Sequence, residues 1–467
     1  MSRIPLLLLA SSTLIAGCAV GPKYESAQPQ TAPAWQATLP QPDPAADLKQ
    51  WWQQFNDPVL AGMIDAAQAS SPTLAQAAAR IAQARAQVAA SRGGLWPSAD
   101  VNARASRGNT TGPTLTSTSA SVDALWEIDL WGANARTLTA ARAREQARGA
   151  EWHGARVSLA AEVADTYTAY RACDQLAQVL TEDSASREQS AKIVGLRANA
   201  GFDPPADARL AQASAADARQ RLIAQRAECD LNIKALVMLT GLAEPELRKQ
   251  IATAIKFPEP SRFAVQTIAA ELIAQRPDIV SRERELAAAS EEIGIAQANR
   301  LPRISLLGSI GVAGVRVNGS TNDQSTWSFG PSLALPLFDA GRRKAGVDAA
   351  QARFDEARAG YEQSVRAAVR EVEEALVRLD SATRRQTDAQ AASRDYDAFF
   401  SATESRFKAG SVGVLDLEDA RRTQLAARQG LIGVQRERVA AWISLYKAVG
   451  GGWSDADLPK LSKAPHN

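Results

Sequence analysis

Residues 120–130 read Ala120-Ser121-Val122-Asp123-Ala124-Leu125-Trp126-Glu127-Ile128-Asp129-Leu130, and this stretch carries the clearest structural pattern in the chain. Its apolar side chains occupy alternate positions, and Leu125 is the one apolar residue among the polar ones. Residues 99–106 and 327–337 alternate in the same way, and residues 304–312 do so more weakly. Alternating segments of about ten residues are typical of transmembrane β-strands, which place apolar side chains toward lipid and polar ones toward a lumen.

Four such strands are too few to close a membrane barrel, and open sheet edges cannot lie in lipid. The pattern therefore predicts association, because three copies would supply twelve strands, an even number within the known range. A soluble sandwich edge is the alternative, and short hairpin loops rich in Gly, Ser and Thr are compatible with it. The strands alone leave both interpretations open.

The remaining sequence favours the membrane interpretation. Proline is absent between Pro113 and Pro204 and between Pro336 and Pro459, and both intervals are rich in Ala, Arg, Gln and Glu. A helix over about 133–199 would be roughly 100 Å long at 1.5 Å per residue. The second interval contains a heptad seam formed by Tyr361, Val365, Ala368, Val372, Ala375 and Leu379. A soluble coiled coil explains the helices alone, but it does not explain strands inserted into the same repeat.

The chain contains an internal repeat. Three glycine landmarks recur at one offset, since 341 − 132, 410 − 201 and 450 − 241 all equal 209. We expect a first repeat over 57–256, with a β-hairpin about 98–130 and a long helical hairpin about 133–241. The second repeat would cover 257–450, with the corresponding hairpins about 303–337 and 340–449. An extended segment over 18–56 precedes the repeats, and a tail over 451–467 follows them.

Residues 1–17 are expected to be a signal peptide, because one basic residue precedes a short apolar run that ends in small side chains. The run ends in Leu14-Ile15-Ala16-Gly17-Cys18, which resembles a bacterial lipobox in which lipid is attached to the Cys18 thiol. An ordinary secretory signal that happens to contain a cysteine is the alternative. Ala19 replaces the aspartate that often retains lipoproteins at the inner membrane, so the outer membrane is favoured.

Composition argues against several classes of protein. The 53 basic and 51 acidic side chains nearly balance and are spread along the chain, so no charge excess indicates a nucleic-acid partner. The two histidines are too few for histidine-based metal or acid–base chemistry. A phosphate-binding Gly-rich loop is also missing from the sequence. We therefore expect neither an enzyme nor a cofactor beyond the lipid on Cys18.

Several short stretches together resemble the TolC-like outer-membrane efflux factors, specifically the lipoprotein branch that serves resistance-nodulation-division pumps. They lie in the expected order and cover nearly the whole mature chain. The stretches are Gly17-Cys18-Ala19-Val20-Gly21-Pro22-Lys23-Tyr24, Trp51-Trp52, Phe55-Asn56-Asp57-Pro58-Val59-Leu60, Glu127-Ile128-Asp129-Leu130-Trp131-Gly132, Gln275-Arg276-Pro277-Asp278-Ile279 and Leu337-Phe338-Asp339-Ala340-Gly341-Arg342.

The resemblance implies a mainly α-helical homotrimer, with a twelve-stranded transmembrane β-barrel in the outer membrane and a long α-helical tunnel across the periplasm. It implies a passive duct for small molecules such as drugs, solvents or metal ions. Its partners would be a periplasmic adaptor (a membrane fusion protein), an inner-membrane transporter of the resistance-nodulation-division type and outer-membrane lipid. Two alternatives are an exit duct of a type I protein secretion system and a lipid-anchored periplasmic coiled-coil scaffold without a pore.

Two turns are predicted at the periplasmic ends of the helical hairpins. Glycine suits them because tight helix–helix turns often need positive φ. In the first turn Asp203 is predicted to cap the returning helix before Pro204. By resemblance both turns contact the adaptor, although a plain structural turn accounts for their composition equally well. The turn residues are Gly201, Phe202 and Asp203 in the first repeat and Gly410, Ser411, Val412 and Gly413 in the second.

The start of the last long helix is the candidate gate. Leu415 and Asp419 are four residues apart and therefore share a helix face. By resemblance Leu415 is an apolar constriction, Asp416 and Asp419 supply acidic groups, and Arg422 is a candidate tether. Phe407 stands where the family often has a tyrosine, so a gate bond through that hydroxyl is not expected. An ordinary solvated helix start is the alternative.

Cys173 and Cys229 lie 28 residues before and 28 residues after Gly201, since 201 − 173 equals 229 − 201. In an antiparallel hairpin that turns at Gly201 they would stand at the same height. The periplasm is oxidising, so the spacing predicts a disulfide. Two unlinked cysteines in the helical core are the alternative.

Overall fold

The computed structural model describes residues 20–32, 34–39, 48–109, 112–253, 257–258, 269–453, 456 and 458–459. The predicted signal peptide and Cys18 lie outside these residues. The elements in chain order are η2 (Leu48–Phe55), α2 (Pro58–Ser70), α3 (Pro72–Gly93), β1 (Ser98–Gly108), β2 (Leu115–Ile128), α4 (Ala133–Asn199), α5 (Pro205–Thr240), α6 (Glu244–Ala252), α7 (Ala269–Ala274), α8 (Pro277–Ala298), β3 (Arg303–Val317), β4 (Ser320–Ala334), α9 (Arg342–Lys408) and α10 (Val414–Ala448).

The internal repeat is confirmed. Both α4 and α9 contain 67 residues, and their first residues, 133 and 342, differ by 209. The helices α5 and α10 start 209 residues apart as well, at 205 and 414. The three pairs of glycine landmarks all have positive φ, between 68° and 88°. Glycine is needed there because side-chain-bearing residues rarely adopt this conformation.

The four strands form one antiparallel sheet in the order β1-β2-β3-β4. The pairing of β2 with β3 joins the two repeats, and β1 and β4 are the edges. One face is apolar: Val101, Val122, Ile310 and Trp327 are successive cross-strand partners, and all four side chains are exposed. On the opposite face the Asp123 carboxylate accepts hydrogen bonds from Asn102, Ser121 and Ser309. The sheet therefore separates apolar from polar side chains as the alternation predicts.

Two of the predicted boundaries are wrong. The alternation was expected to continue to Leu337, but β4 ends at Ala334. β4 ends there because Ala334 pairs with Arg303, the first residue of β3, so no residue of β3 remains to pair with Leu335 or Leu337. The segment over 18–56 was expected to be extended throughout, but Leu48–Phe55 form the 3₁₀ helix η2.

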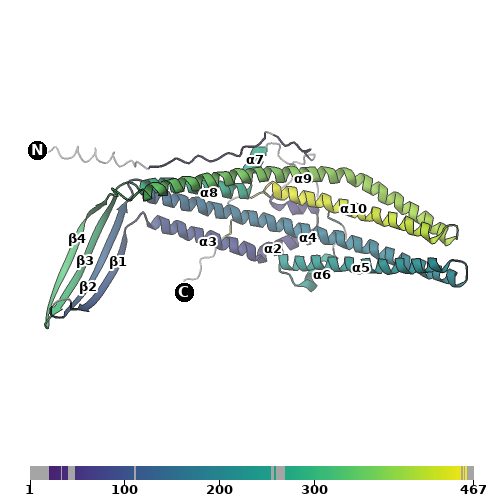
Figure 1. The fold of residues 1–467 in the computed structure, drawn as a ribbon, viewed down its shortest axis with the longest axis horizontal. Helices are drawn as coiled ribbons and strands as arrows, with labels where there is room; N and C mark the ends of the chain where they lie inside the picture. The colour runs from purple at the N-terminus through teal and green to yellow at the C-terminus, as the bar shows by residue number, and fades with distance from the viewer. Residues whose placement is uncertain are drawn as a thin grey trace.

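The molecule is elongated, with the sheet at one end and the tips of both helical hairpins at the other (Figure 1). The long helices α4 and α9 run from the sheet to the tips. Near the sheet they pack against α3 and α8, and near the tips against α5 and α10. Among the described residues, no helix is both long and apolar enough to cross a membrane.

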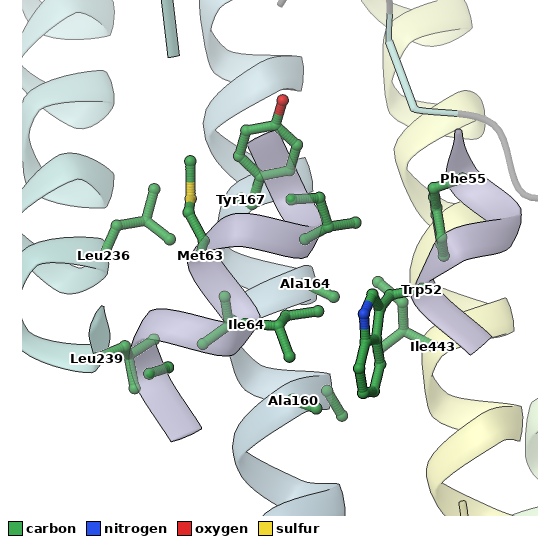
Figure 2. Close-up of a cluster of buried hydrophobic side chains, with 14 of the residues drawn as sticks. Trp52, Phe55, Met63, Ile64, Ala160, Ala164, Tyr167, Leu236, Leu239 and Ile443 are labelled. Carbon is green, nitrogen blue, oxygen red and sulfur yellow. The ribbon is translucent and has the colours of Figure 1, made fainter. Parts of the chain in front are cut away.

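The largest buried cluster lies at mid-length, where η2 and α2 pack against α4, α5 and α10 (Figure 2). Bulky side chains such as Trp52 and Met63 fill the spaces beside small ones on α4, such as Ala160 and Ala164. The Asp57 carboxylate accepts a hydrogen bond from the Val59 N–H at the start of α2 and another from the Tyr167 hydroxyl. All six residues of the predicted heptad seam on α9 are buried.

Two tryptophans fix the sheet to the helices. The Trp131 indole N–H donates to the Pro302 carbonyl over 2.7 Å, and that of Trp126 donates to the Leu95 carbonyl over 3.2 Å. The Trp131 carbonyl in turn accepts the N–H of Val20 over 3.3 Å. The N-terminal segment therefore starts, in the described structure, at the joint between the sheet and the helices.

The first helical hairpin contains a disulfide. Cys173 on α4 and Cys229 on α5 are bonded, and their Cα atoms are 5.5 Å apart. The two cysteines stand at the same height because the hairpin turns midway between them. Their bond crosslinks α4 to α5 part of the way between the tip and the mid-length core.

Replacing both Cys173 and Cys229 by serine should lower the thermal stability of the first hairpin. For a separation of 56 residues, the chain-entropy argument gives a loss of roughly 4 kcal/mol. We expect this loss as earlier helix melting, followed by circular dichroism of the full chain in detergent. In the unreduced parent protein neither thiol should react with an alkylating reagent, whereas two alkylated thiols would contradict the bond.

Candidate functional site

Both hairpin tips have the same turn geometry. In the first, the Gly201 N–H donates to the Ala198 carbonyl and the Phe202 N–H donates to the Arg197 carbonyl. The corresponding bonds of the second tip begin at Gly410 and at Ser411. The φ angles of the two glycines are 79° and 74°, and a Cβ on either would meet no atom within 4 Å. The turns therefore require glycine for its backbone conformation and not for lack of space.

The first tip differs from the prediction at its cap. Pro204 and not Asp203 is the N-cap of α5, and no side chain caps this helix. The Asp203 carboxylate instead pairs with Arg197 at 2.9 Å, across the turn. The helix tolerates the missing cap because Pro205, at its first position, has no N–H to satisfy. Phe202 projects from the tip with 79% of its surface exposed.

In the second tip, the four predicted contact residues differ in exposure. Ser411 and Gly413 are exposed, but Val412 packs against a buried cluster of Val194, Ala211, Phe407, Val414 and Leu417. This tip cluster draws residues from α4, α5, α9 and α10 and includes Phe407, which is buried. The outer surface of the second tip is thus formed mainly by small groups.

The predicted gate residues divide into two roles. Leu415, Asp419 and Arg422 lie on the exposed side of α10, and the Arg422 guanidinium donates to the Asp419 carboxylate over 2.6 Å. Asp416 instead caps the helix: its carboxylate accepts a hydrogen bond from the Gly413 N–H over 3.1 Å at the start of α10. An acidic residue at this position is also favoured by the helix dipole.

A buried ionic cluster lies behind the exposed side of α10, and the sequence reasoning missed it. The Arg421 side chain is about 1% exposed and donates to the Ser186 and Ser190 hydroxyls of α4 over 3.0 and 3.1 Å. It also pairs with Glu418, and its guanidinium carbon lies 5.5 Å from the centre of the Phe400 ring on α9.

The same cluster continues through Arg187 on α4, which pairs with Asp183 and with Glu418. Glu418 also accepts the hydroxyl of Ser214 on α5 over 2.8 Å. The two arginines and two carboxylates balance in charge, and the cluster connects all four hairpin helices. Burial lowers the pKa of the Arg421 guanidinium, and the nearby Glu418 opposes that effect.

Arg422, the candidate tether of the gate, pairs with Asp419 as its spacing predicts, whereas the neighbouring Arg421 anchors α10 to α4. Successive residues of a helix differ by about 100° around its axis, so one arginine of the pair points inward and the other outward. One sign of the inward face was present in the sequence: Asp183, Ser186, Arg187 and Ser190 follow helical spacing on α4. The sequence does not show that this polar stripe meets α10.

Comparison with known proteins gives consistent matches. The family described as outer membrane efflux protein matches residues 63–242 and 268–451. The chain is 30% identical to outer membrane protein OprJ of Pseudomonas aeruginosa, over 96% of this chain and 95% of that one. It is 29% identical to the solvent efflux pump outer membrane protein SrpC of Pseudomonas putida, over 94% and 97% respectively.

A similar match is found among solved structures. The outer-membrane channel OprN superposes on this chain with a TM-score of 0.83 and 27% sequence identity. The alignment covers 93% of this chain and 100% of that one. The likeness therefore includes both the sheet and the helical hairpins.

Replacing Arg421 by methionine should loosen the tips, because it leaves buried Asp183 and half-buried Glu418 with only Arg187 to balance them. Removing one partner of a buried ionic cluster costs about 3–5 kcal/mol. We expect faster hydrogen–deuterium exchange of amides in residues 183–190 and 414–421. Arg394→Met on α9 is the matched control, since that side chain is 75% exposed and should leave exchange unchanged. Equal exchange in the two variants would contradict the anchoring role.

Proposed function

Because the chain belongs to the outer membrane efflux protein family, we propose that it is the passive outer-membrane duct of a tripartite efflux system. This family consists of outer-membrane ducts and is not a family of enzymes. The chain is accordingly an outer-membrane protein with a large periplasmic part. The duct would pass small molecules such as drugs, solvents or metal ions, a cargo class suggested by the solvent efflux pump relative.

One observation carries the proposal: in the described residues, a sheet with one apolar face and two unpaired edges is continuous with helices of 67 residues. Unpaired edges cannot remain in lipid. Three protomers would pair each β1 with a neighbouring β4 and close a barrel of twelve strands. The same threefold arrangement would bring the helical hairpins together as a tunnel roughly 100 Å long.

We assign the tunnel's partners to its far end. An inner-membrane transporter of the resistance-nodulation-division type would hand over the cargo, and a periplasmic adaptor would dock on the tips. Exposed Phe202 offers the adaptor an apolar contact, and Gly201, Gly410, Ser411 and Gly413 offer backbone groups. Val412 would stabilise the turn and not contact the adaptor, because its side chain packs against the tip cluster.

A lipid on Cys18 would anchor each protomer. Val20, whose N–H is bonded to the Trp131 carbonyl, follows Cys18 by two positions in the chain. Two extended residues span at most about 7 Å. The lipid would therefore enter the membrane beside the joint between sheet and helices, where the apolar face of the sheet begins.

Electron microscopy of the protein extracted in detergent from outer membranes tests the duct. Adding a ~30 Å membrane barrel to the ~100 Å helices gives threefold tubes about 130 Å long. Thin rods or compact particles without a barrel would contradict the proposal and would favour a lipid-anchored scaffold instead.

We further propose that α10 carries the gate. Leu415, exposed by 67%, would form an apolar ring across the threefold axis, and Asp419 an acidic ring one turn further along. Three facing carboxylates repel one another unless cations or arginines compensate them. Arg422, at 2.6 Å from Asp419, is placed to supply that compensation.

Asp419→Ala should loosen the closed state, because Arg422 would lose its partner and three arginines would then repel across the axis. We expect higher single-channel conductance and greater uptake of large antibiotics. Asp217→Ala is the matched control, since Asp217 is also an exposed carboxylate paired with an arginine one helical turn away. Conductance and uptake equal to those of the parent would argue against the acidic ring.

A further inference from the structure

A row of hydrogen-bond donors crosses the sheet near its end away from the helices. Arg107 on β1 pairs with Thr116 on β2, which pairs with Arg316 on β3, which pairs with Thr321 on β4. Both arginine side chains are exposed. No ion pair within 4.0 Å joins either of them to a carboxylate in the described part of the chain.

This donor row lies on the apolar face of the sheet. Arg107 is six residues beyond Val101 on β1, and Arg316 is six residues beyond Ile310 on β3. Side chains alternate between faces with a period of two, so an even separation keeps them on the same face. Arg107 and Arg316 therefore point outward, toward the membrane, together with Val101 and Ile310.

The height of the row places it just outside the hydrocarbon layer. The apolar face of β3 extends from Ile304 to Val312, which is about 27 Å along the strand and ~20 Å of height at a tilt of about 40°. Arg316 lies four residues further along, about 10 Å higher. The hairpin then ends in the two-residue turn Asn318-Gly319, so Arg316 is held close to the tip. This is the depth of the outer leaflet's headgroups.

The spacing of the two arginines suits phosphate groups. They stand on strands separated by one other strand, so their backbones are about 10 Å apart. Guanidinium groups bind phosphate oxygens bidentately, and the threonine hydroxyls between and beside them add further donors. Asp323 lies on the same face one row nearer the helices, where its carboxylate lies over Gly314 and is not within ion-pair distance of Arg107 or Arg316.

We propose that Arg107 and Arg316 form a binding site for the phosphate groups of an outer-leaflet lipid. The site rests on the membrane orientation of the proposed duct, with the hairpin tips outside the cell. Its occupant is a phosphorylated glycolipid or phospholipid held laterally against the barrel wall. Such contacts would fix the height of the barrel in the membrane from its outer side.

The test uses the full chain in detergent and diphosphorylated lipid A as the probe. The variant is Arg107→Gln with Arg316→Gln, and the matched control is Arg104→Gln, which removes an arginine from the opposite face of β1. We expect at least about tenfold weaker lipid A binding by the double variant, since each surface arginine contributes measurably to anionic lipid binding. The control should bind as the parent does.

Three results would overturn the site. They are undiminished binding by the double variant, an equal loss in the Arg104→Gln control, and displacement of lipid A by inorganic phosphate at comparable concentration. Dephosphorylated lipid A should bind the parent no better than it binds the double variant. If the double variant does not assemble, the parent protein alone tests the site. It should bind diphosphorylated lipid A more tightly than dephosphorylated lipid A, and equal binding of the two lipids would reject the site. Threefold tubes in electron micrographs of the parent test the duct separately.

Discussion

The unpaired backbone edges of β1 and β4 constrain the whole molecule. Their outward N–H and C=O groups have no strand partner in the described part of one protomer, and lipid supplies none. Closure with neighbouring copies satisfies both edges at once, and it carries the helices of each copy into the same assembly. The alanine-rich seams of α4 and α9 suit that arrangement, because small side chains permit close packing on more than one side of a helix.

The two repeats are joined at both ends of the protomer by different physical means. Near the membrane, backbone hydrogen bonds between β2 and β3 join them. At the tips they are joined by the apolar tip cluster and by the ionic cluster around Arg421. Backbone pairing in a sheet holds the strands in one register. The side chains of an ionic cluster, by contrast, can exchange hydrogen-bonding partners when the helices around them move. The tips are therefore the end at which a docking partner has interactions to rearrange.

Periodicity and glycine spacing were sufficient to predict the repeat, the four strands and the long helices, since these depend on local pattern. The failures concern which partner a side chain meets. The pairing of Arg422 with Asp419 followed from helical spacing, but the anchoring of α10 by Arg421 did not, because Arg421 and Arg422 have the same chemistry and differ only in direction around the helix. Asp203 was expected to cap a helix, but a competing arginine across the turn engages it instead. Such choices depend on packing between segments far apart in the sequence.

The residues of the proposed gate and the anchoring residue Arg421 lie on different faces of α10. A helix that lines a lumen has one face exposed to that lumen, and its other face must pack against the neighbouring helices. Leu415 and Asp419 occupy the first face, and Leu417 and Arg421 occupy the second, alternating within two turns. Because both faces belong to one helix, a rotation of α10 about its axis that moves the anchored face turns the exposed face by the same angle. The seating of Arg421 against α4 thereby sets the direction in which Asp419 points.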